Sequence, residues 1–136
     1  MRYVPALLLA VLVSAGCGDG SRPGQGGGAV DSRLTVTVSD APAAAPRTWT
    51  LTCDPPGGDH PRPAEACAAI DAARQPFAPK PADAMCTLIH GGPQTATITG
   101  TWRGSPVDAA YRRTDGCEIA RWNALSAVLE SGGTGS

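Results

Sequence analysis

Residues 53–70 read Cys-Asp-Pro-Pro-Gly-Gly-Asp-His-Pro-Arg-Pro-Ala-Glu-Ala-Cys-Ala-Ala-Ile, and local structural preference changes sharply within this stretch. Its first half is rich in Pro and Gly, which favour turns. Residues 64–74 are Ala-rich and place Cys67 and Ile70 three positions apart, as on one face of a helix. The stretch therefore predicts a turn that leads into a short helix, with Cys53 before the turn and Cys67 inside the helix.

On either side of this stretch, apolar residues alternate with other residues, which is typical of half-buried strands. Four segments show the alternation: Leu34, Val36 and Val38; Trp49, Leu51 and Cys53; Ala96, Ile98, Gly100 and Trp102; Val107, Ala109 and Tyr111. Residues 103–106 between the last two segments read as a hairpin turn. Residues 120–130 fit either a helix or a short closing strand. We predict an α+β fold in which one or two short helices cover one face of an antiparallel sheet.

The composition indicates a small domain that needs covalent support. The chain has 136 residues, with 17 Gly and 13 Pro and few aromatic residues, so it cannot build a large aromatic core. Its formal net charge is −1, and its 11 basic residues are scattered. A nucleic-acid ligand is therefore not expected, because binding one requires clustered Lys and Arg.

The amino terminus predicts export. Residues 4–13 form an almost unbroken apolar run that is too short for a permanent transmembrane helix, so we interpret residues 1–17 as a secretory signal peptide. The run ends in Ser-Ala-Gly-Cys17, which resembles the lipobox of bacterial lipoproteins. Lipidation of Cys17 would explain the odd count of five cysteines, and ordinary cleavage is the alternative. We expect an extracellular protein, secreted or lipid-anchored to the outer face of the membrane, with no other membrane contact.

The remainder of the chain divides by composition. Residues 18–31 read as a flexible Gly-rich linker, residues 32–130 as one folded domain, and residues 131–136 as a disordered tail. In an oxidising compartment the four domain cysteines are expected to pair. Three pairings are open, and the nearest-neighbour one is favoured: Cys53 with Cys67, and Cys86 with Cys117.

Neither a metal site nor an enzyme is expected. The cysteines lack the Cys-x-x-Cys spacing of a zinc site, and His60 and His90 are isolated in the sequence. The chain shows no nucleophile, base and orienting residue at a recognisable spacing. We interpret His60, within its Pro- and Gly-rich surroundings, as a structural residue that bonds to nearby backbone.

The stretch that opens this section resembles the signature of the subtilisin inhibitor-like family of secreted bacterial serine protease inhibitors. The matching positions are Cys53, Pro55, Gly58, His60, Pro61, Ala66 and Cys67, with Ile70 at a position where the family usually has Leu. The resemblance continues through Met85-Cys86, Gly100-x-Trp102-x-Gly104, Tyr111 and Cys117-Glu118, so it spans residues 34–129.

This resemblance implies a sheet of about five antiparallel strands, two disulfides in the nearest-neighbour pairing and a homodimer. It also implies a reactive loop that begins at the third domain cysteine and comprises Cys86, Thr87, Leu88, Ile89 and His90. Leu88 would enter the primary specificity pocket of the protease, and the scissile bond would join Leu88 to Ile89. The expected partners are extracellular subtilisin-like or chymotrypsin-like serine proteases, whose pockets accept apolar side chains.

The loop also departs from the family pattern. Thr87 stands where the family commonly has Pro, and Gly91 and Gly92 lie in the region where Asp-Pro is common. Glycine adds backbone freedom, so the sequence predicts a softer loop. The alternative function is therefore an exported lipoprotein that keeps the inhibitor-like fold and acts as a non-inhibitory binding module.

Overall fold

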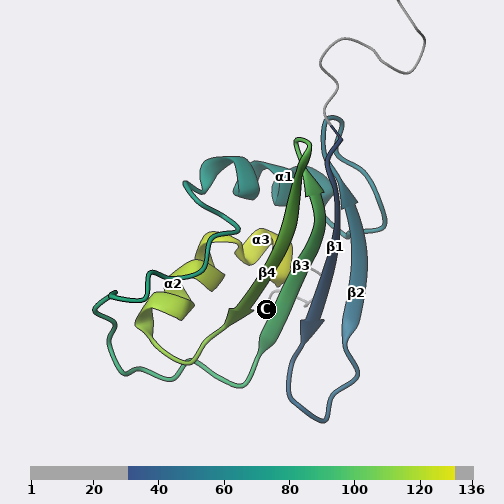
Figure 1. Ribbon diagram of the computed structural model, residues 1–136. Helices are drawn as coiled ribbons and strands as arrows, with labels where there is room; N and C mark the ends of the chain where they lie inside the picture. Colours follow the sequence, from purple (N-terminus) through teal and green to yellow (C-terminus); the bar gives the residue numbers. More distant parts are fainter. Residues whose placement is uncertain (1–30, 131–136) are drawn as a thin grey trace, which may run out of the picture.

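The computed structural model describes residues 31–130, which form one sheet and three helices. The strands are β1 (Arg33–Ser39), β2 (Arg47–Thr52), β3 (Thr95–Trp102) and β4 (Ser105–Arg112). The helices are α1 (Pro63–Ala72), α2 (Gly116–Ala124) and α3 (Ser126–Leu129). Figure 1 shows the strands side by side, with α3 behind β3 and β4 and with α2 to the left of β4.

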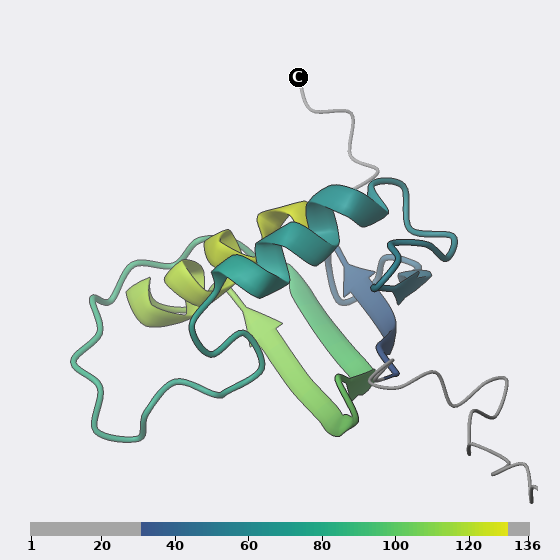
Figure 2. The same cartoon turned by 90° about the horizontal axis from the view of Figure 1, so that it is seen from above.

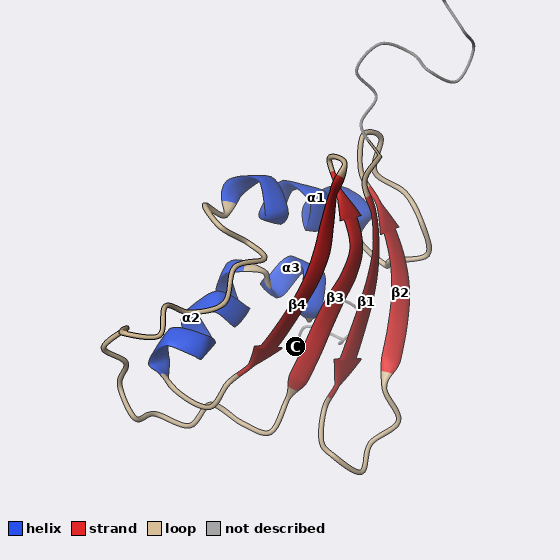
Figure 3. Ribbon diagram, in the orientation of Figure 1, coloured by secondary structure: helices blue, strands red, loops and turns tan. Residues whose placement is uncertain are grey.

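The sheet order is β2-β1-β3-β4, and every neighbouring pair is antiparallel. β1 pairs with β3 along its whole length, from Arg33 opposite Thr101 to Ser39 opposite Thr95. The α+β class is confirmed, and the part of the chain that the structure describes contains four strands, slightly fewer than the expected count of about five. Figure 3 shows these strands in red and the helices in blue.

Residues 120–130, which the sequence left open, are helical. The Asp115 side chain caps α2 by accepting a hydrogen bond from the Glu118 backbone N–H at 2.8 Å. Beyond this cap, the buried side chains recur at intervals of three or four residues, which is the helical period. These are Trp122, Leu125, Val128 and Leu129. A strand here would have turned part of this set toward solvent.

The core lies between the sheet and the helices, which all cover one face of the sheet, as Figure 2 shows from above. His60 is part of this core, and its ring contacts the Trp49 ring edge-on at a centroid distance of 5.3 Å. Its Nδ1 accepts a hydrogen bond from the Arg62 backbone N–H at 3.1 Å, and its Nε2 lies 2.9 Å from the Val128 carbonyl oxygen. His60 therefore links the turn before α1 to α3, in agreement with a structural role.

Two disulfides connect elements that are distant in the sequence. Cys53–Cys67 joins the end of β2 to α1, with a Cα–Cα distance of 5.8 Å. Cys86–Cys117 joins the segment before β3 to the first turn of α2, with a Cα–Cα distance of 5.3 Å. By the chain-entropy argument, each bond stabilises the fold by about 3 kcal/mol.

Several predictions concern residues outside 31–130. The signal peptide, Cys17, nearly all of the linker at residues 18–31 and the tail at residues 131–136 lie there. In the described part, no helix combines the length and the apolar character needed to cross a membrane.

Candidate functional site

The longest connection in the fold, residues 73–94, carries the most exposed apolar side chains. It leaves α1, projects beyond α2 and returns to β3, as the tan trace in Figure 3 and the view in Figure 2 both show. Met85 and Leu88 are each 98% exposed, and Ile89 is 60% exposed. No other large apolar side chain among the described residues is exposed. Connections of this length without regular structure are commonly functional.

On its amino-terminal side, the exposed segment is anchored to the start of α2. The disulfide fixes Cys86 to Cys117, and the carbonyl oxygen of Thr87 accepts a hydrogen bond from the Gly116 backbone N–H at 2.9 Å. The Thr87 hydroxyl packs directly against the Gly116 Cα, where any Cβ would overlap with it. Glycine at position 116 therefore permits the close approach of Thr87 to the helix.

On its carboxyl-terminal side, the segment is anchored to the end of β4. The Gly91 backbone N–H donates to the Arg113 carbonyl oxygen at 2.6 Å, and the Gly91 carbonyl oxygen accepts from Arg113 Nε at 3.0 Å. A Cβ on Gly91 would lie 2.8 Å from Ile119 Cδ1, so glycine at this position also allows the loop to pack closely against α2. The sequence predicted a softer loop from the two glycines, whereas the structure places Gly91 at a hydrogen-bonded contact point.

The residue that caps α2 also supports the loop, because Asp115 directly precedes Gly116. Its carboxylate accepts the Glu118 backbone N–H and forms an ion pair with Lys80, which lies earlier in the same long connection. The hydrogen bond from Lys80, followed by that from Glu118, lowers the pKa of the Asp115 carboxyl from its usual value of 3.8. Asp115 thus holds the first turn of α2, where the Gly116 backbone N–H donates to the Thr87 carbonyl oxygen.

Leu88 and Ile89 lie between these two anchors. The structure therefore brings together the five residues predicted for the reactive loop at one projecting segment with fixed ends. Its exposed side chains are available to a partner, and its backbone is held from both sides.

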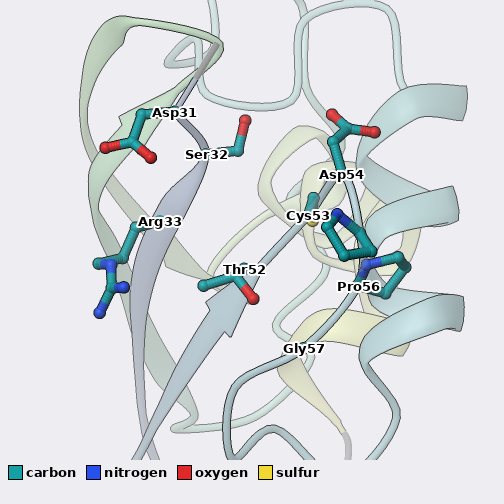
Figure 4. A pocket seen from close by; sticks show the side chains of 9 residues that line it. Asp31, Ser32, Arg33, Thr52, Cys53, Asp54, Pro56 and Gly57 are labelled. Atoms are coloured by element: carbon teal, nitrogen blue, oxygen red, sulfur yellow. The ribbon is translucent and has the colours of Figure 1, made fainter. Parts of the chain in front are cut away.

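A cavity of about 290 Å³ lies at the opposite end of the sheet (Figure 4). It is lined by Asp31, Ser32, Arg33, Thr52, Cys53, Asp54, Pro55, Pro56 and Gly57. This lining contains no histidine, and its cysteine is in a disulfide. Cys86 and Cys117 also lie close to Asp115, but their sulfurs are bonded to each other and offer no thiolate to a metal.

Comparison with known proteins places this geometry in a family. The family model described as "Subtilisin inhibitor-like" matches residues 30–114, which is more than half of the chain. The chain belongs to the subtilisin inhibitor-like family. It is 36% identical over 100 residues to "Subtilisin inhibitor-like protein 1" of Streptomyces cacaoi, an alignment that covers 70% of this chain and 88% of the relative.

Other Streptomyces relatives have similar names. The chain is 40% identical over 105 residues to "Subtilisin inhibitor-like protein 3" of Streptomyces coelicolor, covering 72% of this chain and 94% of the relative. It is 35% identical over 111 residues to a "Subtilase-type protease inhibitor" of Streptomyces fradiae, covering 73% of each chain.

For this subtilisin inhibitor-like chain, sequence reasoning did not find three residues that the structure places at the loop. Met85 was quoted only as part of the family pattern, although an apolar residue in a Pro- and Ala-rich stretch is a usable signal. Arg113 and Asp115 were missed because their contacts cross more than 20 residues of sequence. Asp115 with Glu118 three residues later is a local pattern that indicates a helix start. No local pattern indicates the contact of Arg113 with Gly91 or of Asp115 with Lys80.

Proposed function

We propose that this subtilisin inhibitor-like protein is a serine protease inhibitor that binds subtilisin-like or chymotrypsin-like proteases through residues 86–90. The observation that carries the proposal is the full exposure of Leu88 between two anchored positions, Thr87 and Gly91. Two relatives carry the names "Subtilisin inhibitor-like protein 1" and "Subtilase-type protease inhibitor", and these names support the same class of partner.

In the proposed complex, Leu88 fills the apolar primary specificity pocket of the protease. Burial of a leucine side chain contributes about 1.5–3 kcal/mol. The neighbouring backbone pairs with the enzyme as an added strand. Because the disulfide and the two backbone hydrogen bonds, from Gly116 to Thr87 and from Gly91 to Arg113, hold the loop before binding, little conformational entropy is lost on association.

The reaction with the protease is reversible in this proposal. The enzyme's serine oxygen attacks the Leu88 carbonyl carbon, the Leu88–Ile89 bond breaks, and the Ile89 nitrogen leaves as an amine with a proton from the enzyme's histidine. The resulting ester is attacked again by the same amine, which the fold retains nearby. This second step restores the peptide bond and the free serine, so net hydrolysis is slow.

Met85 supplies a second apolar contact. It is as exposed as Leu88 and lies three residues before it, on the amino-terminal side of the proposed scissile bond. Exposure of an apolar methionine to water is unfavourable in the free protein, and binding to a partner removes this exposure. The flexible methionine side chain also adapts to an irregular apolar surface. We therefore assign Met85 to the interface with the protease.

The setting of the proposed inhibitor is extracellular, with the folded domain at residues 32–130 and the protein either secreted or tethered by a lipid on Cys17. We also propose a homodimer, because the family resemblance implies one. Mass spectrometry of the native amino terminus tests the lipid, and light scattering of the purified protein tests the dimer. A water-soluble mature chain without a lipid on Cys17 contradicts the tether.

The function itself is tested by titrating subtilisin and chymotrypsin with the purified protein. We expect stoichiometric loss of protease activity, with Leu88→Gly as the matched variant that weakens it. Thr87 and the Gly91-Gly92 pair, which depart from the family pattern, favour the competing function of a non-inhibitory binding module. That function predicts cleavage of the loop without inhibition, and this result would contradict the proposal.

A further inference from the structure

The two halves of the proposed reactive loop are held by different kinds of bond. On the amino-terminal side, the covalent Cys86–Cys117 bond lies two residues before the proposed scissile bond. On the carboxyl-terminal side, the chain is not secured by the sheet until Thr95, where β3 begins. Among the described residues, the backbone between Ile89 and Gln94 bonds to the rest of the domain only at Gly91, through Arg113.

Arg113 is itself fixed from two directions. Its backbone directly follows β4, which ends at Arg112 and pairs with β3. Its guanidinium donates to the Asn123 side-chain oxygen at 3.2 Å and lies 5.8 Å from the centre of the Trp122 ring. Since Trp122 is buried in the core, the guanidinium connects Gly91 to the rigid part of α2. The planar guanidinium can serve these contacts at once, which a single ammonium group cannot do.

We propose that Arg113 is a positioning residue that keeps the amine of Ile89 in place after the Leu88–Ile89 bond opens. This inference rests on the proposed inhibitory function. Once the bond is open, Ile89 is joined to the domain only through His90 and Gly91, so the position of Gly91 decides how far the new amine moves. Holding it near the ester raises its effective concentration and favours re-formation of the amide over attack by water. The step restores the peptide bond, releases the serine hydroxyl and needs no further reactant.

Arg113 therefore controls the duration of inhibition more than its initial strength. The intact loop is held by the peptide bond, the disulfide and the backbone hydrogen bond from Gly91 to Arg113 whether or not the guanidinium is present, so first binding depends little on the guanidinium. The opened loop has lost its connection to the disulfide side, and its carboxyl-terminal half is held at Gly91 by two hydrogen bonds, one from the Gly91 N–H to the Arg113 carbonyl and one from the guanidinium. Without the guanidinium, only the first remains to hold the free end. Loss of the guanidinium is expected to convert a lasting inhibitor into a temporary one.

The test compares Arg113→Met and Arg113→Lys with the unchanged protein. Methionine keeps an unbranched chain beside Trp122 but cannot donate to Gly91, whereas lysine keeps the charge and one donor group. Arg103→Met is the matched control, because Arg103 also lies over a tryptophan, Trp102 at 5.0 Å, and pairs with Asp71 away from the loop. For each protein, three quantities are measured: the initial inhibition constant, the rate of cleavage at Leu88–Ile89, and the equilibrium ratio of cleaved to intact inhibitor under a trace of protease.

We expect Arg113→Met to keep its initial inhibition constant within a few-fold. Its cleavage rate and its ratio of cleaved to intact inhibitor should each rise on the order of tenfold. Arg113→Lys should fall between this variant and the unchanged protein, and Arg103→Met should match the unchanged protein. A melting temperature measured on each variant separates these effects from loss of the fold, because unfolding would also raise the initial inhibition constant.

The outcomes separate this inference from the function on which it rests. If Arg113→Met is cleaved at the rate of the unchanged protein, the positioning role is wrong even though inhibition persists. If the unchanged protein is a simple substrate, the proposed function is wrong, and faster cleavage of Arg113→Met would still support the positioning role. Equal cleavage of all variants in that case overturns both.

Discussion

At the scale of single residues, Leu88 and Ile89 differ in exposure, and the proposed roles rest on this difference. Leu88 is 98% exposed and directly follows Thr87, whose carbonyl is fixed by Gly116, whereas Ile89 is 60% exposed. Leu88→Lys should weaken inhibition of subtilisin-like enzymes, because the ammonium would lose water in an apolar pocket. It should strengthen inhibition of trypsin-like enzymes, whose pocket contains an aspartate. Inhibition constants against one enzyme of each type measure both effects.

Truncation at the same position tests how much of the affinity Leu88 carries. Leu88→Gly should cost about 2–4 kcal/mol of binding free energy, as expected for a residue that dominates an interface. Ile89→Gly is the comparison, and it should cost less. If Ile89 substitutions change inhibition and Leu88 substitutions do not, the register is shifted by one residue and Ile89 enters the pocket. If neither changes it, the loop is not the binding site.

The contact between Gly116 and Thr87 gives a second residue-scale prediction. Gly116→Ala should favour helix α2 locally, because alanine has the higher helix propensity. It should nevertheless weaken inhibition on the order of tenfold or more, because the new Cβ overlaps with the Thr87 hydroxyl and displaces the loop. Removing that hydroxyl as well, in Thr87→Ala with Gly116→Ala, should recover most of the loss. Additive effects in this double-mutant cycle would show that the contact does not position the loop.

At the scale of elements, the amino terminus of α2 is sensitive to acid. The pKa of Asp115 is lowered in the folded protein, so the stability that its carboxylate supplies is present above about pH 3.8 and is lost as the pH falls through the lower folded value. Stability and inhibition should therefore decline together in that acidic range. Asp115→Asn should flatten this part of the pH profile, because asparagine still caps the helix but cannot titrate or pair with Lys80.

Asp59 provides the control for this experiment. Its pKa is also lowered, first by the hydrogen bond from the Thr50 backbone N–H on β2. Asp59→Asn should alter the acid dependence of stability, measured by thermal melts at several pH values. It should leave the acid dependence of inhibition by the remaining folded protein unchanged, because Thr50 lies on β2, at the opposite edge of the sheet from β4 and Arg113. An equal effect of both variants on inhibition would argue against a specific role for Asp115.

Sequence patterns predicted regular elements better than contacts between them. The alternation around Leu34, Leu51, Ile98 and Ala109 located all four strands, because one face of each packs on the core and the other does not. Residues 120–130 stayed open between helix and strand, because the signal that decides for α2 lies before residue 120, in the cap formed by Asp115. The loop was located through the family resemblance, whereas its anchors depend on how β4 and α2 pack together.

At the scale of the whole molecule, the two disulfides should have separable effects. Replacing Cys53 and Cys67 by Ser should lower the free energy of unfolding by about 3 kcal/mol and leave inhibition by the remaining folded protein intact. Replacing Cys86 and Cys117 by Ser should cost a similar amount and also release the loop, so the protein becomes a substrate. Denaturant titrations and cleavage assays measure the two effects. Rapid cleavage after loss of Cys53–Cys67 alone would contradict this division.

The β3–β4 hairpin separates the two ends of the domain. The described chain starts at Asp31, whose carbonyl accepts a hydrogen bond from Gly104 at the turn of this hairpin, whereas the loop and Arg113 lie at its open end. A group attached at Asp31 would therefore sit a full strand length away from the loop that we propose contacts the protease. A bead, a dye or a second protein attached there should leave the loop unobstructed, so the proposed inhibitor would suit affinity capture of proteases from solution.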